Sequence, residues 1–153
     1  MSKKTWIISA FPCMGKSHYV QNNPDTSIDI DSFDFSWFDA DVTRNPNFPS
    51  NYISHIKGNI GKYKYIMVSS HKVVRQALID EGLTFIYVCP GNGLKDEFIQ
   101  RARSRGSSND FIRTLEVNWD SWLDHNECSS MTFVTCQGQY LTDVLETLEG
   151  FIR

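Results

Sequence analysis

The stretch that decides the fold is Thr5-Trp6-Ile7-Ile8-Ser9-Ala10-Phe11-Pro12-Cys13-Met14-Gly15-Lys16-Ser17. Its first half is a short apolar run, as expected for a β-strand that is buried on both faces. Its second half, from Ala10 to Ser17, matches the pattern of a phosphate-binding loop (P-loop, or Walker A motif), with Ala10 where the pattern usually has its first glycine. A helical pattern follows from Lys16, so the stretch predicts a strand, a loop and a helix in that order.

The residue types in this loop suit polyphosphate binding. A turn between strand and helix directs several backbone amides towards one point, so we expect Cys13, Met14 and Gly15 to hold phosphate oxygens. Lys16 supplies a mobile charge for the β- and γ-phosphates, and the Ser17 hydroxyl can ligate Mg²⁺. The loop therefore predicts ATP and Mg²⁺ as cofactors. The alternative is a chance match on an ordinary strand-turn-helix.

Apolar runs alternate with helical patterns along all 153 residues, which predicts one α/β domain with a largely parallel sheet. The expected strands are 5–10, 27–31, 65–69, 84–89 (closed by Pro90) and 131–136. Helical periodicity is expected over 16–22, around 53–60 and 73–78, near 98–102, over 111–122, and over 141–152.

Composition excludes several classes of protein. A hydrophobic content of 41% with ten Phe and four Trp excludes a disordered chain. The net charge of −3 gives no indication of a nucleic-acid or membrane partner. The four cysteines form no C-x-x-C pair and no histidine stands at zinc-finger spacing from them, and a chain with this much core needs no disulfide framework. No apolar run approaches 18 residues. We therefore expect a cytoplasmic protein with reduced thiols and no membrane segment.

Two carboxylates, Asp29 and Asp31, stand at i, i+2 near the end of the second expected strand, so their side chains point to the same side. The carboxyl end of a parallel strand beside the loop is where α/β folds bind ligands. Either residue could accept a proton from an attacking hydroxyl or hold Mg²⁺ through water. The alternative is a solvated acidic strand end.

Two segments break the alternation of strands and helices and could close over a ligand. Residues 31–50 are aromatic and acidic, and Trp37 is the best candidate for a stacking contact with a nucleobase, although these aromatics could equally be core. Residues 91–109 carry Arg101, Arg103 and Arg105, of which 101 and 105 share a helix face. Such arginines can neutralise charge during phosphoryl transfer, or they can pair with Asp96 and Glu97 on a solvated helix.

The third expected strand ends in Ser69-Ser70-His71, without the aspartate that many P-loop enzymes place there. Ser70 is expected to cap the next helix. His71 is a candidate contact for the acceptor substrate. The missing carboxylate shifts a metal role towards Asp29 and Asp31.

The chain resembles small P-loop kinases related to adenylate and other nucleoside monophosphate kinases. It is especially similar to short nucleotide-kinase-like proteins of tailed bacteriophages, for which the setting would be the host cytoplasm. The residues that carry the resemblance are 10–17, 28–31, 44–49, 51–53, 68–71, 87–90, 101–106 and 138–141.

The resemblance implies a three-layer P-loop kinase fold, with a five-stranded parallel sheet and helices on both faces. It also implies an acceptor-binding insertion at about 33–60 and a lid at about 91–110. Arg44 would hold the acceptor phosphate, Arg101 and Arg105 would be lid arginines, and the turn around Gln137 and Gly138 would lie near the donor base.

The leading functional hypothesis is an ATP- and Mg²⁺-dependent phosphotransferase of nucleotide metabolism that acts on a (deoxy)nucleoside monophosphate. Lys16, Asp29 or Asp31, Arg101 and Arg105 would be catalytic, Trp37, Arg44 and His71 would bind substrate, and Ser17 and Asp31 would hold the metal. An alternative is a hydroxyl kinase that acts in DNA modification, on a hydroxymethyl pyrimidine or a DNA end, and that uses Asp29 or Asp31. A second alternative is a non-catalytic ATP-binding module. The choice between ATP and GTP and the oligomeric state stay open.

Overall fold

The computed structural model describes residues 4–30, 37–38, 43–44, 46–123 and 131–152. Its main sheet has five strands in the order β2-β5-β1-β6-β7, and every neighbouring pair runs parallel. The strands are β1 (Trp6–Ala10), β2 (Ser27–Asp29), β5 (Tyr65–Ser69), β6 (Phe85–Pro90) and β7 (Met131–Thr135). The predicted fold class, an α/β protein with a five-stranded parallel sheet and helices on both faces, is confirmed.

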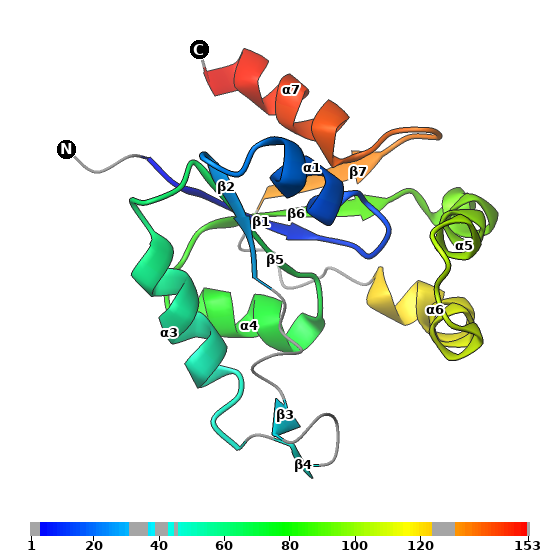
Figure 1. The fold of residues 1–153 in the computed structure, drawn as a ribbon, viewed down its shortest axis with the longest axis horizontal. Helices are drawn as coiled ribbons and strands as arrows, with labels where there is room; N and C mark the ends of the chain where they lie inside the picture. The colour runs from blue at the N-terminus through cyan, green and yellow to red at the C-terminus, as the bar shows by residue number, and fades with distance from the viewer. Residues whose placement is uncertain (1–3, 31–36, 39–42, 45, 124–130, 153) are drawn as a thin grey trace.

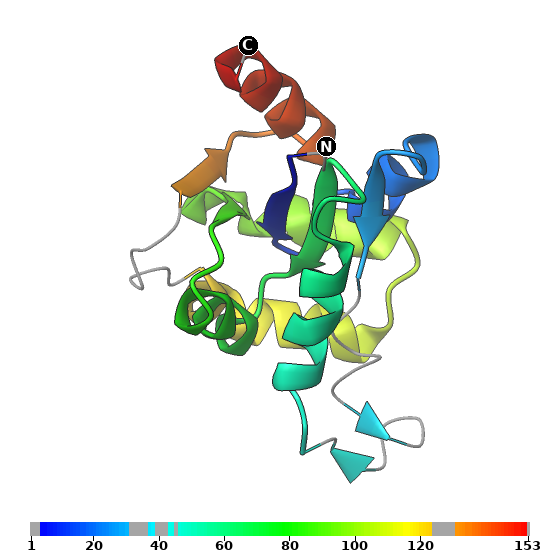
Figure 2. The same ribbon diagram turned by 90° about the vertical axis from the view of Figure 1, so that its left-hand side faces the viewer.

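Six α-helices of the described residues surround this sheet (Figures 1 and 2). They are α1 (Lys16–Asn22), α3 (Ser50–Asn59), α4 (Lys72–Asp80), α5 (Lys95–Ser104, preceded by the 3₁₀ turn Asn92–Leu94), α6 (Asn109–Trp122) and α7 (Leu141–Ile152). The connection through α1 runs outward from β1, whereas those through α3 and α4 run back across the sheet, so right-handed crossovers place the two sets on opposite faces. α7 lies with α1. None of these helices has the length and apolar character needed to cross a bilayer.

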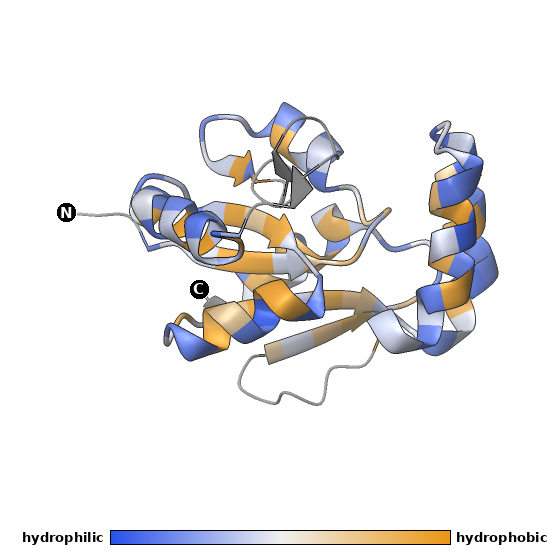
Figure 3. Ribbon diagram, turned by 90° about the horizontal axis from the view of Figure 1, so that it is seen from below, coloured by the Kyte–Doolittle hydropathy of each residue, from blue (hydrophilic) through white to orange (hydrophobic). Residues whose placement is uncertain are grey.

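The core lies on both sides of the three central strands, β1, β5 and β6. Ile8, Ile66 and Val88 are fully buried, and β5 and β6 are buried along their whole length. The strands of the sheet are largely orange in the hydropathy view of Figure 3, whereas the helices alternate. Continuous apolar runs identified these strands because a parallel strand covered on both faces has no polar side.

The ends of some elements differ from the sequence prediction. Pro90 is the last residue of β6 rather than a residue beyond it, and the ladder continues because the Gly91 amide donates to the Thr135 carbonyl at 3.1 Å. β2 ends at Asp29, two residues earlier than expected. α3 ends at Asn59, so Ile60 lies past the helix and is 43% exposed.

A second, two-stranded sheet lies within the segment predicted as an acceptor-binding insertion. It is the antiparallel pair of β3 (Trp37–Phe38) and β4 (Thr43–Arg44), in which Trp37 is opposite Arg44. Strands of two residues are too short to produce a recognisable alternation, so the sequence did not predict this hairpin.

The topology fixes where a ligand can bind. The connection that leaves β1, through α1, runs towards β2, whereas the connection that leaves its neighbour β6, through α5 and α6, runs towards β7, so the two lie on opposite faces of the sheet. Such a switch point leaves a crevice at the carboxyl ends of the strands. The loop between β1 and α1 begins at this crevice, and α5 and α6 lie at the same end of the sheet (Figure 1).

Candidate functional site

The loop between β1 and α1 is held in an unusual backbone conformation. Cys13 has φ of 66° and Gly15, which precedes α1, has φ of 93°. Glycine adopts positive φ without steric penalty, whereas cysteine does not. A Cβ on Gly15 would also lie 3.4 Å from Cδ1 of Tyr140. Position 15 therefore favours glycine because of its backbone conformation, whereas the added Cβ alone would only make ordinary contact with Tyr140.

Ala10 occupies the position where the loop pattern usually has its first glycine, and the structure explains why alanine is accommodated. Ala10 is still part of β1, paired with Ser69 on one side and Val88 on the other, and it is fully buried. A strand residue needs no positive φ, so a methyl group is tolerated wherever the core has room for it.

A cavity of about 460 Å³ opens beside the loop, and we call it the loop cavity. It brings together residues that the sequence analysis selected from four separate parts of the chain. Those on its wall are Cys13, Met14, Gly15, Lys16, Ser17, Asp29, His71 and Arg105. The predicted donor-binding residues and one of the two strand carboxylates thus meet at the carboxyl edge of the sheet.

The hydroxyl of Ser17 donates a hydrogen bond to the carboxylate of Asp29 at 3.3 Å. Two neighbouring ligands of octahedral Mg²⁺, each about 2.1 Å from the ion, are about 3 Å apart. Mg²⁺ prefers oxygen ligands and takes few of them from the protein, since it keeps water and phosphate oxygens. Ser17 and Asp29 therefore fit such an ion. No larger group of potential metal ligands occurs among the described residues.

Tyr52 of α3 ties the end of β2 to the end of β5. Its side chain is fully buried, and its hydroxyl donates to the Ile30 carbonyl and accepts from the Ser69 amide at 3.1 Å. This bridge fixes the strand end that carries Asp29 relative to the strand end that precedes His71. Sequence reasoning gave Tyr52 no role, because its partners are 22 and 17 residues away.

A second cavity, of about 500 Å³, adjoins the first, and we call it the turn cavity because residues of the 136–140 turn line it. It shares Cys13, Gly15 and Arg105 with the loop cavity. Gly138 and Tyr140 also border it, and Tyr140 is 45% exposed. The turn around Gln137 and Gly138, predicted to lie near a donor base, thus stands beside the loop.

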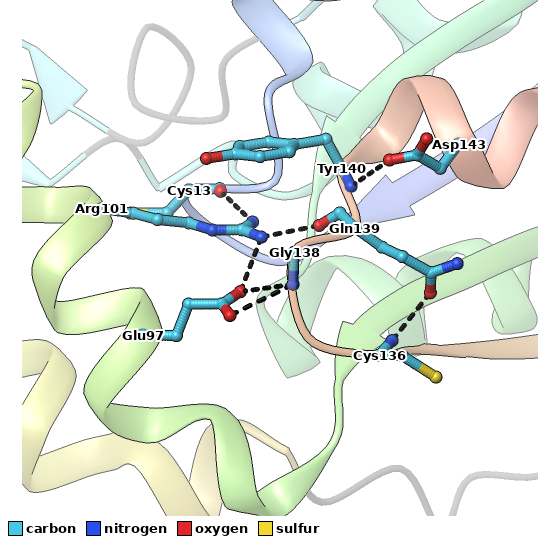
Figure 4. A network of polar contacts seen from close by, with 8 residues as sticks. All are labelled: Cys13, Glu97, Arg101, Cys136, Gly138, Gln139, Tyr140 and Asp143. Carbon is cyan, nitrogen blue, oxygen red and sulfur yellow. Dashed lines mark hydrogen bonds and ion pairs between the residues drawn. The ribbon is translucent and has the colours of Figure 1, made fainter.

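Arg101 lies between the loop and this turn rather than in solvent (Figure 4). Its guanidinium donates to the carbonyls of Cys13 at 3.0 Å and Gln139 at 2.7 Å, and it pairs with Glu97 at 2.8 Å. Its side chain is only 8% exposed. The predicted pairing with Glu97 is present, but the predicted solvated helix face is not, because the arginine is covered by the turn.

Arg105 has a different setting. It follows the last residue of α5, is exposed, and borders both cavities. Its Nε donates to the Ser107 hydroxyl at 2.9 Å, and its guanidinium lies 5.3 Å from the centre of the Phe111 ring. Arg105 therefore lies at the junction of the two cavities.

His71, rather than Ser70, is the residue that precedes α4, so the predicted cap is displaced by one position. The reason is that the Ser69 hydroxyl accepts from the His71 amide at 3.2 Å, and the Ser70 carbonyl accepts from Arg75 at 2.9 Å. The exposed His71 ring lies edge-on to Trp122, with 5.8 Å between ring centres.

Three predicted site residues are described only in part or not at all. Asp31 lies outside the described residues. For Trp37 and Arg44 the description covers the backbone, which places them opposite each other in the β3–β4 hairpin. Their roles stay predictions.

Burial raises the pKa of the Cys13 thiol, and the nearby Arg105 and Arg101 guanidinium groups oppose this shift. A raised pKa keeps the sulfur protonated at neutral pH, and a protonated thiol is a poor nucleophile. Cys13 therefore contributes its backbone and its bulk to the loop rather than covalent chemistry.

Comparison with protein-family models and with curated proteins finds no match for this chain.

Proposed function

We propose that the protein is a Mg²⁺-dependent phosphotransferase that moves the γ-phosphoryl group of a nucleoside triphosphate to a nucleotide-type acceptor. The observation that carries this proposal is the shared wall of the loop cavity, where the glycine-containing loop, Lys16, Ser17 and Asp29 meet. Cation, hydroxyl and carboxylate are the groups that phosphoryl transfer needs, because the reaction is catalysed mainly by positioning and charge neutralisation.

The donor would extend over both cavities. Its β- and γ-phosphates would contact the loop amides and Lys16, and its base would enter the turn cavity beside Tyr140. An exposed aromatic ring offers a face on which any base can stack. The adjoining cavities support this arrangement, because a nucleotide needs a phosphate site and a base site in direct continuity.

Transfer forms a bond between an acceptor oxygen and the γ-phosphorus and breaks the bond from that phosphorus to the β-bridging oxygen, releasing the diphosphate. Negative charge spreads over the moving group, and Lys16 and Arg105, which line the loop cavity, would neutralise it. The metal, bound through Ser17 and the Asp29 carboxylate, would supply further positive charge to the phosphates.

The leading acceptor is a (deoxy)nucleoside monophosphate, whose phosphate oxygen is already nucleophilic and needs no base. The engagement of Asp29 with Ser17 favours a metal role for this carboxylate, which suits such an acceptor. Arg44 would hold the acceptor phosphate.

A second acceptor, a hydroxyl group on a DNA base or a DNA end, is favoured by one observation. Asp29 is half-buried at the wall of the loop cavity, where a carboxylate could accept the proton of an attacking hydroxyl. In this case the acceptor substrate would be DNA rather than a small nucleotide.

The test is a coupled assay of diphosphate release with Mg²⁺ and either ATP or GTP. One arm offers a panel of deoxynucleoside monophosphates, and the other offers duplexes with hydroxymethyl pyrimidines or 5′-hydroxyl ends. We expect turnover with one or more monophosphates. Turnover only with DNA would select the hydroxyl acceptor, and tight ATP binding without turnover would indicate a binding module. Absence of triphosphate binding would refute the proposal.

Lys16→Ala is the variant that should lose activity. Its control is Lys62→Ala, which changes an exposed lysine in the loop before β5. Removing a single charge-stabilising group from a phosphoryl-transfer site should lower kcat on the order of 10²–10³-fold. The control should keep the wild-type rate.

A further inference from the structure

The phosphate loop, residues 10–17, contains a residue in an unfavourable backbone conformation, and contacts with the rest of the protein must stabilise it. Cys13 has a side chain and yet adopts φ of 66°, a region that is unfavourable for residues other than glycine. Such conformations persist only where surrounding contacts enforce them. The contact at Cys13 is the hydrogen bond from Nη1 of Arg101 to its carbonyl, at 3.0 Å.

A hydrogen bond to a carbonyl also sets the direction of the next amide. In a planar trans peptide the C=O and the following N–H point in opposite directions. The Cys13 carbonyl is held towards Arg101, which borders the turn cavity, so the Met14 amide points away from it. Met14 itself borders the loop cavity.

The next two carbonyls are held in the same way. The Met14 carbonyl accepts from the Leu141 amide at 2.8 Å, and the Gly15 carbonyl accepts from the Tyr19 amide at 3.0 Å. Three consecutive peptide groups thus have their carbonyls engaged outside the loop. Consecutive amides oriented together form a concavity that binds anions.

Arg101 is itself fixed tightly enough to act as a support. Its Nη2 donates to the Gln139 carbonyl at 2.7 Å and pairs with Glu97 at 2.8 Å. Its guanidinium carbon lies 3.8 Å from the centre of the Tyr140 ring and 4.3 Å from that of Phe98. Glu97 in turn accepts from the Gly138 amide at 3.1 Å, which ties the turn to the same pair.

We infer that Arg101 is a positioning residue that shapes the phosphate loop: by holding the Cys13 carbonyl outward, it directs the Met14 amide towards the donor phosphates. This role rests on the proposed function, and it replaces the charge-neutralising role that the sequence predicted for Arg101. It leaves Arg105 as the exposed arginine that faces the phosphates.

The test compares Arg101→Lys and Arg101→Ala with Arg103→Ala, a change at an exposed arginine of the same helix. The probes are inorganic tripolyphosphate and ATP, each with Mg²⁺, measured by calorimetry. Lysine keeps the charge but cannot bridge two carbonyls and a carboxylate while stacked on a ring. Both Arg101 variants should weaken both probes by about tenfold or more, the effect of losing one charged hydrogen bond. Arg103→Ala should bind like wild type.

Two results would overturn the inference. Wild-type affinity in Arg101→Lys would mean that charge alone matters, and a loss for ATP without a loss for tripolyphosphate would mean that Arg101 contacts the base. Should Arg101→Ala fail to fold, Arg101→Lys and Glu97→Gln still decide the outcome, since Glu97→Gln removes the anion that holds the guanidinium.

Hydrogen exchange of the unliganded protein separates this inference from the proposed function. Amides of residues 11–17 should exchange faster in Arg101→Lys than in wild type, with no change in β1, and Arg103→Ala should exchange like wild type throughout. If wild type binds neither probe, the proposed function fails, and equal exchange in wild type and Arg101→Lys would then show that the arginine does not support the loop either.

Discussion

Ser17 and Asp29 are 12 residues apart in sequence, and a 3.3 Å hydrogen bond joins the Ser17 hydroxyl on the first turn of α1 to the Asp29 carboxylate at the end of β2. The start of α1 thereby has a carboxylate partner on the edge strand of the main sheet, whereas β5, the neighbour of that strand, ends at Ser69 and is followed by Ser70 and His71. Asp29 is therefore the carboxylate that lies closest along the sheet to the start of α1 among the residues that line the loop cavity.

Asp29→Asn should distinguish a metal role from a base role. If the carboxylate orients Mg²⁺, the change should raise the Mg²⁺ concentration needed for half-maximal activity by about 10–100-fold, as for other residues that support a metal. If it is the base, kcat should fall by about 10²–10⁴-fold with an unchanged Mg²⁺ requirement. Measuring activity as a function of Mg²⁺ concentration at saturating ATP gives both kcat and the Mg²⁺ concentration for half-maximal activity. The control is Asp25→Asn, in the exposed turn before β2.

Gly15→Val should abolish triphosphate binding while the protein stays folded. Valine cannot easily adopt φ of 93°, so the loop must rearrange. The core strands are untouched, so the far-UV circular dichroism spectrum should be unchanged. Wild-type ATP affinity in this variant would show that the loop does not hold the phosphates. Gly58→Val, at an open position in α3, serves as the control for substitution itself.

Tyr52→Phe should destabilise the protein and reduce activity together. Removing the hydroxyl leaves the Ile30 carbonyl and the Ser69 amide without their buried partner, at a cost of about 1–3 kcal/mol. For a chain of this size each kcal/mol corresponds to a fall of about 2–4 °C in Tm. Tyr63→Phe, at a half-buried tyrosine before β5, should change Tm far less. An equal effect of the two variants would contradict a specific role for the Tyr52 bridge.

Ionisation of the Cys89 thiol should lower the free energy of unfolding at alkaline pH. Burial raises the pKa of its thiol from 9.0 to about 11, with Arg75 opposing the shift. The folded protein therefore binds this proton more tightly than the unfolded chain does. The contribution of the protonated thiol to the free energy of unfolding is complete below pH 9, and this contribution is lost as the pH rises from 9 to 11. The difference in urea midpoint between wild type and Cys89→Ala should narrow across that range, and a constant difference would mean that the thiol does not titrate.

Much of the fold is determined by short runs of neighbouring residues, and for that reason it could be predicted from the sequence. β5 and α1 were placed to the residue, since a continuous apolar run and a short helical segment stopped before Pro24 can be recognised from neighbouring residues alone. The ends of β2, β6 and α3 were less accurate, because they depend on which neighbouring strand or helix supplies the last hydrogen bond.

The candidate site likewise contains residues that neighbouring sequence identifies and contacts that it does not. The loop residues could be found because the motif is contiguous, and the Glu97–Arg101 pair follows from their spacing of four on a helix. The contacts from Arg101 to Cys13 and Gln139 could not be found, since they span 88 and 38 residues. Only the packing of α5 against the loop and the turn brings these groups together.

Ala10 bears on how distant relatives of this chain can be detected. The position lies inside the ladder between β5 and β6, so the backbone there needs no freedom that only glycine provides. A motif definition that requires glycine at the first place would exclude this protein. A definition that admits alanine there, but requires glycine at the place held by Gly15, would include it.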